Sequence, residues 1–185
     1  MPRCAARPLR SAERQARLAK PSRMDTREKI LSREGLREVI EEHRRAGRTV
    51  VFANGVFDFL HAGHVRYLQA ARAEGDLLAV GVNSDAGARK LKGPGRPVLT
   101  ERARAALVAA LEAVDYVVVF DEPDVRALLR ELQPDVHAKG TDYTPETVPE
   151  RDVAELLGIR VAIVGDPKQH STTRLLASLR RTHNG

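Results

Sequence analysis

The chain has 185 residues, of which 42% are hydrophobic and 30% charged, and it contains one cysteine, Cys4. This composition excludes disorder throughout and an internal disulfide framework, and apolar runs such as residues 117–120 are too short to cross a bilayer. The formal net charge is +6, but residues 1–23 alone hold seven basic residues against one acid. The rest of the chain is neutral overall, so a nucleic-acid partner is not expected.

Two segments follow from this distribution. Residues 1–23 lack hydrophobic periodicity and the apolar stretch of a secretory signal, so we predict a disordered basic tail. Residues 24–185 suit one domain with a proper core. We expect a cytoplasmic protein that does not bind a membrane.

The predicted elements begin with an amphipathic helix. Leu36, Val39 and Ile40 recur at helical spacing between residues 32 and 46, and Gly47 ends the helix. Five short apolar segments follow that are typical of strands buried on both faces: 49–53, 77–82, 116–120, 136–138 and 159–164. Helical stretches separate or follow them, at about 63–74, 101–113, 124–132, 149–157 and 172–180.

This alternation predicts an α/β fold, a single Rossmann-like, doubly wound, five-stranded parallel sheet with helices on both faces. Ligands of such sheets bind at the carboxyl ends of the strands, where the strand order reverses. The candidate ligand-binding loops are therefore residues 54–64, 83–100, 139–148 and 165–173.

The first of these loops carries two histidines at the start of a predicted helix. His61 and His64 flank Gly63, so both imidazoles can face the place where helix N–H groups attract anions such as a triphosphate. We expect Gly63 to let the backbone come close, and Asn54-Gly55 to form a tight exit from the strand. Two alternatives remain: a zinc site, for which no third ligand has an obvious spacing, and purely structural histidines.

The motifs Gly55-Val56-Phe57-Asp58 and His61-Ala62-Gly63-His64 resemble the signature of the cytidylyltransferase-like nucleotidyltransferases. Further segments occur in the family's order, so the resemblance covers about residues 28–181; they are residues 83–85, 90–93, 101–102, 114–116, 139–143 and 171–173. The resemblance implies an enzyme that joins a phosphorylated sugar or alcohol to a nucleoside triphosphate and releases pyrophosphate.

Within this family, residues 29–32, 81–85 and 91–97 are most similar to the adenylyltransferases of ADP-heptose synthesis. The resemblance implies transfer of AMP from ATP to D-glycero-β-D-manno-heptose 1-phosphate. It also implies a homodimer and a separate sugar kinase upstream, since many relatives are fused behind one. The alternatives are cytidylyl transfer to glycerol 3-phosphate or a similar alcohol phosphate, and a non-catalytic nucleotide-binding regulatory module.

The resemblance assigns roles to individual residues. The catalytic group is His61, His64 and Lys92. The nucleotide-binding residues are Gly55, Val56, Phe57, Gly63, Lys139, Gly140, Asp142, Ser171, Thr172 and Thr173. The substrate-binding residues are Asp58, Asn83, Asp85, Lys90 and Arg102. Mg²⁺ is expected to be held mainly through substrate phosphates, with no protein metal site.

Each assignment has a structural alternative. The two lysines can be part of a solvated loop, Asp58 can be a buried cap, and Arg102 can form a surface ion pair. Residues 139–142 can form a glycine turn, and residues 171–173 can cap the last helix. The segment Lys168-Gln169-His170 departs from the family pattern, which puts the closure of that loop over the nucleotide in question.

Overall fold

A computed structural model describes residues 25–166 of the chain. The predicted tail at 1–23, the helix at 172–180, the departure at 168–170 and the site residues Ser171, Thr172 and Thr173 lie outside the described residues, and these remain predictions.

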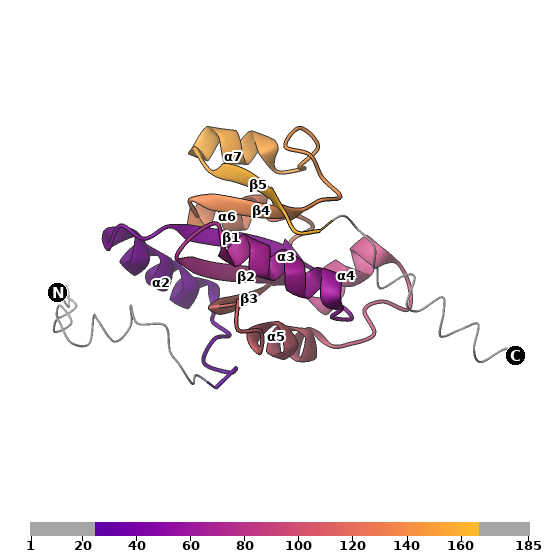
Figure 1. The fold of residues 1–185 in the computed structure, drawn as a ribbon. Coiled ribbons are helices and arrows are strands. Elements are labelled where there is room, and N and C mark those ends of the chain that lie inside the picture. Colours follow the sequence, from indigo (N-terminus) through magenta and orange to yellow (C-terminus); the bar gives the residue numbers. More distant parts are fainter. Residues whose placement is uncertain (1–24, 167–185) are drawn as a thin grey trace, which may run out of the picture.

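The core of the molecule is a five-stranded parallel sheet (Figure 1). Its strands are β1 (Val50–Gly55), β2 (Leu77–Asn83), β3 (Tyr116–Phe120), β4 (Val136–Gly140) and β5 (Arg160–Val164). The strand order is β3-β2-β1-β4-β5, so the chain winds outward from β1 in one direction and then returns to start again at β4. The predicted doubly wound sheet is confirmed, and its reversal point lies between β1 and β4.

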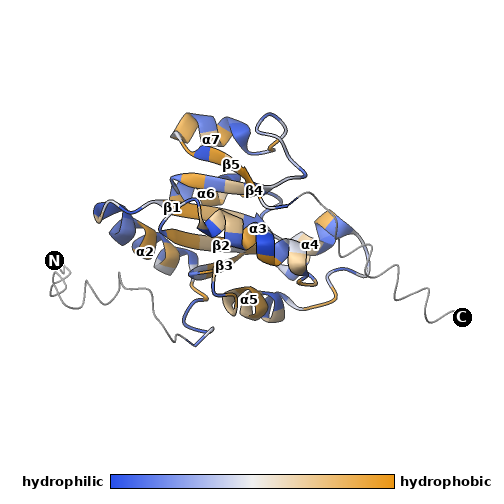
Figure 2. Ribbon diagram, viewed as in Figure 1, coloured by the Kyte–Doolittle hydropathy of each residue, from blue (hydrophilic) through white to orange (hydrophobic). Residues whose placement is uncertain are grey.

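Within residues 25–166, six helices accompany the sheet: α2 (Arg33–Arg45), α3 (Ala62–Arg72), α4 (Asp85–Lys92), α5 (Glu101–Ala109), α6 (Arg126–Leu132) and α7 (Arg151–Leu157). One apolar cluster joins α3 and α5 to one face of the sheet, and a second joins α2, α6 and α7 to the other. Figure 2 shows mainly apolar colours along the strands, whereas α2 and α7 carry both polar and apolar residues. Burial on both sides explains the continuous apolar runs of the strands.

Helix α4 corrects the sequence prediction, which placed a loop over residues 83–100. Ser84 is the N-cap of α4, and its hydroxyl accepts a hydrogen bond from the Gly87 backbone N–H at 3.1 Å. Hydrophobic periodicity did not reveal this helix, because its one large apolar residue, Leu91, is exposed. Lys90 and Lys92 therefore lie on a helix.

Within residues 25–166, no helix is both long and apolar enough to cross a membrane.

Candidate active site

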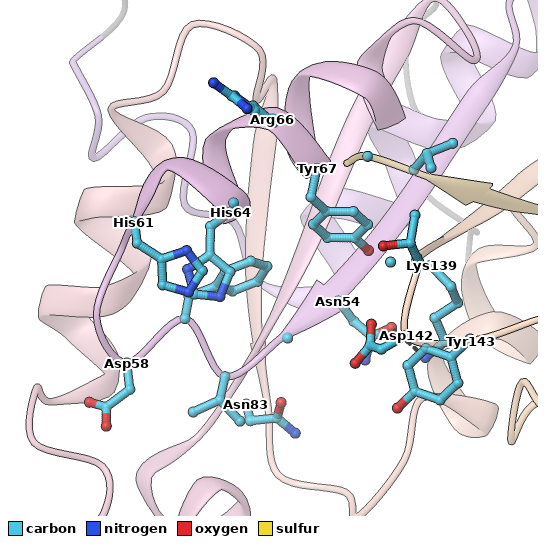
Figure 3. Close-up of a pocket in the computed structure, with 18 of the residues that line it drawn as sticks. Asn54, Asp58, His61, His64, Arg66, Tyr67, Asn83, Lys139, Asp142 and Tyr143 are labelled. Carbon is cyan, nitrogen blue, oxygen red and sulfur yellow. Dashed lines mark hydrogen bonds between the residues drawn. The ribbon is translucent and has the colours of Figure 1, made fainter. Parts of the chain in front are cut away.

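A cavity of about 450 Å³ opens at the carboxyl ends of β1 and β4, where the strand order reverses (Figure 3). This volume suits a small-molecule ligand. Twelve predicted site residues line it: Gly55, Val56, Phe57, Asp58, His61, Gly63, His64, Asn83, Lys92, Lys139, Gly140 and Asp142. Side chains that the sequence analysis had not assigned also line it, among them Asn54, Arg66, Tyr67, Arg96 and Tyr143.

The backbone turns sharply after β1 at Phe57, whose φ is +49°. Strand β1 runs on through Gly55, so the tight exit expected at Asn54-Gly55 lies two residues later. A Cβ at Gly55 would sit 3.0 Å from the Phe57 ring, so glycine is needed here for close approach of that ring. A left-handed φ at a bulky residue is strained, and such strain is typical of functional sites.

His61 and His64 form one wall of the cavity, which we call the histidine wall (Figure 3). Their rings stack with centroids 3.9 Å apart and an interplanar angle of 18°. The His64 ring also packs edge-on against Phe57 at 5.2 Å. A Cβ at Gly63 would lie 3.0 Å from His61 Nδ1, so a glycine at this position leaves room for the His61 ring.

The histidine wall coincides with the start of α3. His61 is the N-cap of α3, which is 11 residues long, and its side chain makes no capping hydrogen bond. The first N–H groups of a helix lack partners within the helix and carry a partial positive charge. The geometry therefore combines two imidazoles with an anion-attracting helix end, as the sequence predicted.

The zinc alternative finds no complete ligand set in this part of the molecule. Among residues 25–166, no group of three His, Cys, Asp or Glu residues is arranged to hold a metal ion. A zinc site at the two histidines would need a third ligand from elsewhere.

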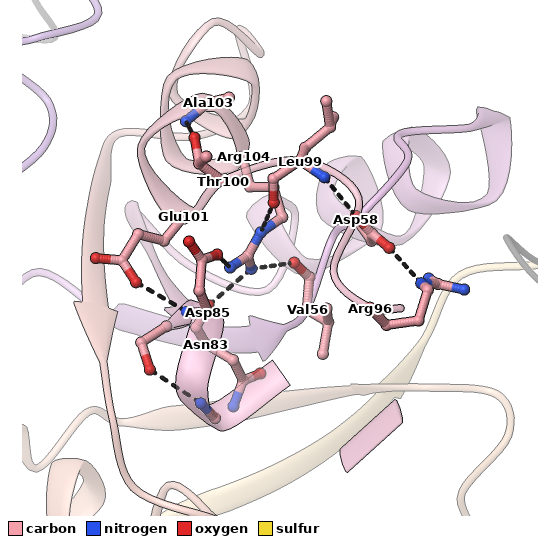
Figure 4. A network of polar contacts seen from close by, with 12 residues as sticks. Val56, Asp58, Asn83, Asp85, Arg96, Leu99, Thr100, Glu101, Ala103 and Arg104 are labelled. Carbon is pink, nitrogen blue, oxygen red and sulfur yellow. Dashed lines mark hydrogen bonds and ion pairs between the residues drawn. The ribbon is translucent and has the colours of Figure 1, made fainter. Parts of the chain in front are cut away.

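A buried arginine that the sequence analysis missed organises the loops on the other side of the Val56-Phe57 turn (Figure 4). Arg104 has no exposed surface. Its guanidinium donates to the carbonyls of Val56 and Asn83 at 2.7 Å each, to the Leu99 carbonyl at 3.0 Å, and to Asp85 Oδ1 at 2.7 Å. We call these five residues the Arg104 cluster.

The position of Arg104 contained a signal that sequence reasoning did not use. Arg104 lies four residues before Val108 on the buried stripe of α5. An arginine in such a stripe must satisfy its donors inside the protein. Arg102, the predicted substrate contact, is exposed and lies outside the cavity lining.

Asp58 is 2% exposed, and its carboxylate contacts a neighbouring loop. It accepts hydrogen bonds from the backbone N–H groups of Val98 at 2.8 Å and Leu99 at 3.1 Å, and it pairs with Arg96. These contacts favour the alternative of a buried cap, in which Asp58 shapes the cavity rim.

The remaining predicted substrate contacts divide between the cavity and its surroundings. Asn83 and Lys92 line the cavity, whereas Asp85 and Lys90 do not. The Asp85 side chain is occupied by Arg104, and Lys90 is exposed on α4.

The wall opposite the histidines carries a second buried charge, Lys139, which is 5% exposed. Its ammonium lies 3.0 Å from Glu150 Oε2 and 3.1 Å from Asn54 Oδ1. His137 Nε2 lies 3.2 Å from the same Asn54 oxygen. Burial, with a smaller contribution from Lys139, lowers the pKa of His137 to about 3, so its ring is neutral. We call Asn54, His137, Lys139 and Glu150 the Lys139 cluster.

Tyr67 and Arg66 connect α3 to strands β4 and β5. The Tyr67 hydroxyl donates to the Ala138 carbonyl at 2.8 Å, and burial raises the pKa of this hydroxyl. Arg66 pairs with Asp166, whose carbonyl accepts a hydrogen bond from the Thr141 hydroxyl at 2.7 Å. The ends of β4 and β5 are thereby joined to the helix that carries the histidine wall.

Comparison with known proteins agrees with this geometry. The model of the cytidylyltransferase-like family matches residues 52–178. The chain is 54% identical over 148 residues to the bifunctional protein HldE of Syntrophotalea carbinolica, covering 80% of this chain and 30% of that one. It is 50% identical over 152 residues to the bifunctional protein HldE of Trichlorobacter lovleyi, covering 82% and 31%. The chain thus spans about a third of these relatives.

A solved structure is also similar. The lipopolysaccharide core biosynthesis protein from Thermoplasma volcanium matches with a TM-score of 0.57 and 29% identity, over 66% of this chain and 100% of that one. The family match, the sheet order and the cavity at the strand reversal agree with one another. The chain therefore belongs to the cytidylyltransferase-like family and is a nucleotidyltransferase.

Proposed function

We propose that this nucleotidyltransferase transfers AMP from ATP to a sugar 1-phosphate, D-glycero-β-D-manno-heptose 1-phosphate, and releases pyrophosphate. The observation that carries the transfer reaction is the histidine wall at the start of α3, facing the cavity at the β1–β4 reversal. Anionic phosphates suit a site of this kind because helix N–H groups and imidazole N–H groups donate to the same region.

The reaction is an in-line displacement at phosphorus. A phosphate oxygen of the sugar phosphate forms a bond to the α-phosphorus, and the bond from that phosphorus to the oxygen bridging to the β-phosphate breaks. The electron pair leaves with pyrophosphate. Catalysis then consists of positioning the two substrates and balancing the charge on the phosphate oxygens, for which His61, His64 and Lys92 line the cavity.

Mg²⁺ fits this site as an ion that arrives bound to the nucleotide phosphates. Two of the carboxylates that line the cavity, Asp58 and Asp166, are already paired with Arg96 and Arg66. A cation that keeps water and phosphate ligands does not need a protein cage. When bound, it would neutralise part of the triphosphate charge.

The choice of substrates rests on relatives. Residues 81–85 and 91–97 resemble the heptose adenylyltransferases. The similarity to two HldE proteins supports this choice. The similar Thermoplasma protein is described as a lipopolysaccharide core biosynthesis protein, which also supports it. We further propose that a sugar kinase supplies the sugar 1-phosphate.

The test offers the purified protein Mg²⁺ with ATP or CTP, and the heptose 1-phosphate or glycerol 3-phosphate, while pyrophosphate release is recorded. We expect release with ATP and the heptose phosphate, and loss of that release in His64→Asn. Glu155→Gln, which changes an exposed carboxylate on α7, is the control that should retain activity.

Two other results would contradict the proposal. Pyrophosphate release with CTP and glycerol phosphate would support the transfer mechanism but would show that both proposed substrates are wrong. No release from any pair, together with calorimetric binding of a nucleotide, would identify a non-catalytic nucleotide-binding module.

A further inference from the structure

Strands β1 and β4 separate at the floor of the cavity, and the Lys139 cluster fills the opening. The backbone register pairs Val51 with Val136, Phe52 with His137 and Ala53 with Ala138, and it ends there. Side chains two residues apart on a strand share a face, so Asn54 continues the face of Phe52, while Lys139 continues that of His137. The three polar side chains of this opening therefore meet on one face of the sheet.

The orientation of the Asn54 carboxamide follows from the chemistry of its neighbours. An ammonium group has donors only, so the Asn54 atom 3.1 Å from Lys139 Nζ must be the acceptor, Oδ1. His137 Nε2 approaches the same oxygen at 3.2 Å and must therefore carry the proton. The ring's other nitrogen, Nδ1, is buried and has no hydrogen-bond partner among residues 25–166.

Lys139 is not arranged like a mobile phosphate ligand. Its side chain is 7% exposed, and that of its partner Glu150 is 4% exposed, with 3.0 Å between the charged atoms. A buried charge that is paired inside the protein contributes little net field to a ligand, and its geometry is held by the partner. Its contacts instead restrain Asn54.

We propose that Asn54 is a substrate-binding residue whose Nδ2 amide donates to an oxygen of a bound substrate, and that Lys139, paired with Glu150, is a positioning residue that holds Asn54 in this orientation. This inference rests on the proposed function. Asn54 lines the cavity, and two donors already occupy its Oδ1. Among the described residues, no acceptor bonds to Nδ2, which leaves that amide for a ligand.

The ligand atom is a hydrogen-bond-accepting oxygen, from a hydroxyl or a phosphate group. Both substrates of a nucleotidyl transfer contain such oxygens. Kinetics with each substrate varied separately distinguish the nucleotide from the sugar phosphate, because a lost contact to one of them raises only that substrate's KM.

Three variants test the two roles. Asn54→Leu removes the amide at nearly constant size. Asn54→Asp keeps an oxygen for Lys139 but replaces the donor by a second acceptor. Lys139→Met is combined with Glu150→Gln so that no uncompensated charge stays buried. Glu155→Gln is the matched control for Glu150→Gln, since it makes the same change at an exposed carboxylate of α7, the helix whose N-cap is Glu150.

We expect both Asn54 variants and the Lys139→Met, Glu150→Gln variant to raise KM for the same one of the two substrates by about tenfold or more, while the other KM changes less than about twofold. Combining Asn54→Leu with the Lys139 and Glu150 changes should add little, because the positioning residue acts through Asn54. A merely structural role predicts a lower unfolding temperature with both KM values unchanged, and that result would overturn the inference. A rise in both KM values to the same extent would also overturn it.

Direct binding separates this inference from the proposed reaction. If the unaltered protein releases no pyrophosphate, the unfolding temperature is measured with ATP, CTP and the two phosphates added singly. A ligand that stabilises the unaltered protein but not Asn54→Leu supports the inference without turnover. Equal stabilisation of the two proteins, or none of either, refutes it.

Discussion

The histidine wall and the Arg104 cluster contact the same turn after β1 but use their polar groups differently. His64 packs against the Phe57 ring, and the two imidazoles lie on the cavity side at the start of α3. Arg104 donates to the Val56 carbonyl and directs its other donors to two more carbonyls and a carboxylate. The first group lines the cavity, whereas the second has its charge balanced within the protein.

This contrast shows that a charged residue within a family motif does not necessarily contact a ligand. Asp58 and Lys139 also line the cavity, yet a loop holds the carboxylate of Asp58 and Glu150 balances Lys139. A group whose partners belong to the protein positions the site, and its loss should first affect stability. A group that faces the cavity should first affect turnover.

The largest effect is expected at the histidine wall. His61→Asn and His64→Asn should each lower kcat by about 10²- to 10³-fold, because each removes a donor near the developing phosphate charge. The free energy of unfolding should change by less than about 1 kcal/mol. Initial rates of pyrophosphate release and urea unfolding measure the two quantities. A large loss of stability with little change in kcat would place the histidines among the structural groups.

Arg104→Met should be the most destabilising change in the Arg104 cluster. It leaves three carbonyls and Asp85 without their donor, and removal of one partner from a buried ion pair costs about 3–5 kcal/mol. Arg102→Met, two residues earlier and exposed, is the matched control and should change stability by less than about 0.5 kcal/mol. Urea unfolding compares the two variants, and equal effects would mean that Arg104 contributes no more to stability than an exposed arginine does.

The Lys139 cluster should make stability depend on pH. The pKa of His137 is lowered to about 3 in the folded protein, against about 6.5 when unfolded. The unfolded chain therefore gains a proton first as pH falls, so this contribution to stability is full above pH 6.5 and is lost as pH falls toward 3. Linkage gives a loss of about 2 kcal/mol between pH 7 and pH 5.

His137→Gln isolates this contribution, because glutamine does not titrate. Urea unfolding of both proteins at pH 7, 6 and 5 should show the difference in their free energies of unfolding shrinking by about 2 kcal/mol as pH falls. A constant difference would mean that His137 takes up a proton in the folded state as readily as in the unfolded one.

The smallest effect is expected on α4, where two lysines differ in position. Lys92 lines the cavity and Lys90 does not. Lys92→Gln should lower kcat/KM by about tenfold, since one exposed charge near phosphates is worth about 1 kcal/mol, and Lys90→Gln by less than about threefold. Rates at low and high salt test this, because screening should reduce both effects. Equal losses of kcat/KM in the two variants would mean that Lys90 contacts the substrate, as the resemblance implies.

The sequence by itself determined the architecture and the location of the cavity. Apolar runs buried on both faces, alternating with helices, were enough to predict the five parallel strands and their helices, and the rule for such sheets directed attention to the loops that form the cavity. The two histidines were found because their spacing around Gly63 is local. Helix α4 was missed because its stability depends on the Ser84 cap and on packing of Gly87 and Ala88, with no stripe of large apolar residues.

Only the tertiary structure decided which charges face the cavity. Arg104 donates hydrogen bonds to carbonyls of residues that lie 21 and 48 positions away in the sequence. Lys139 donates to Asn54, which lies 85 positions away. Whether a charge is balanced depends on such distant partners and on burial, neither of which leaves a periodic pattern along the chain. The sequence indicated residues that are expected to bind phosphate, and the fold separated those that face the cavity from those that hold it in shape.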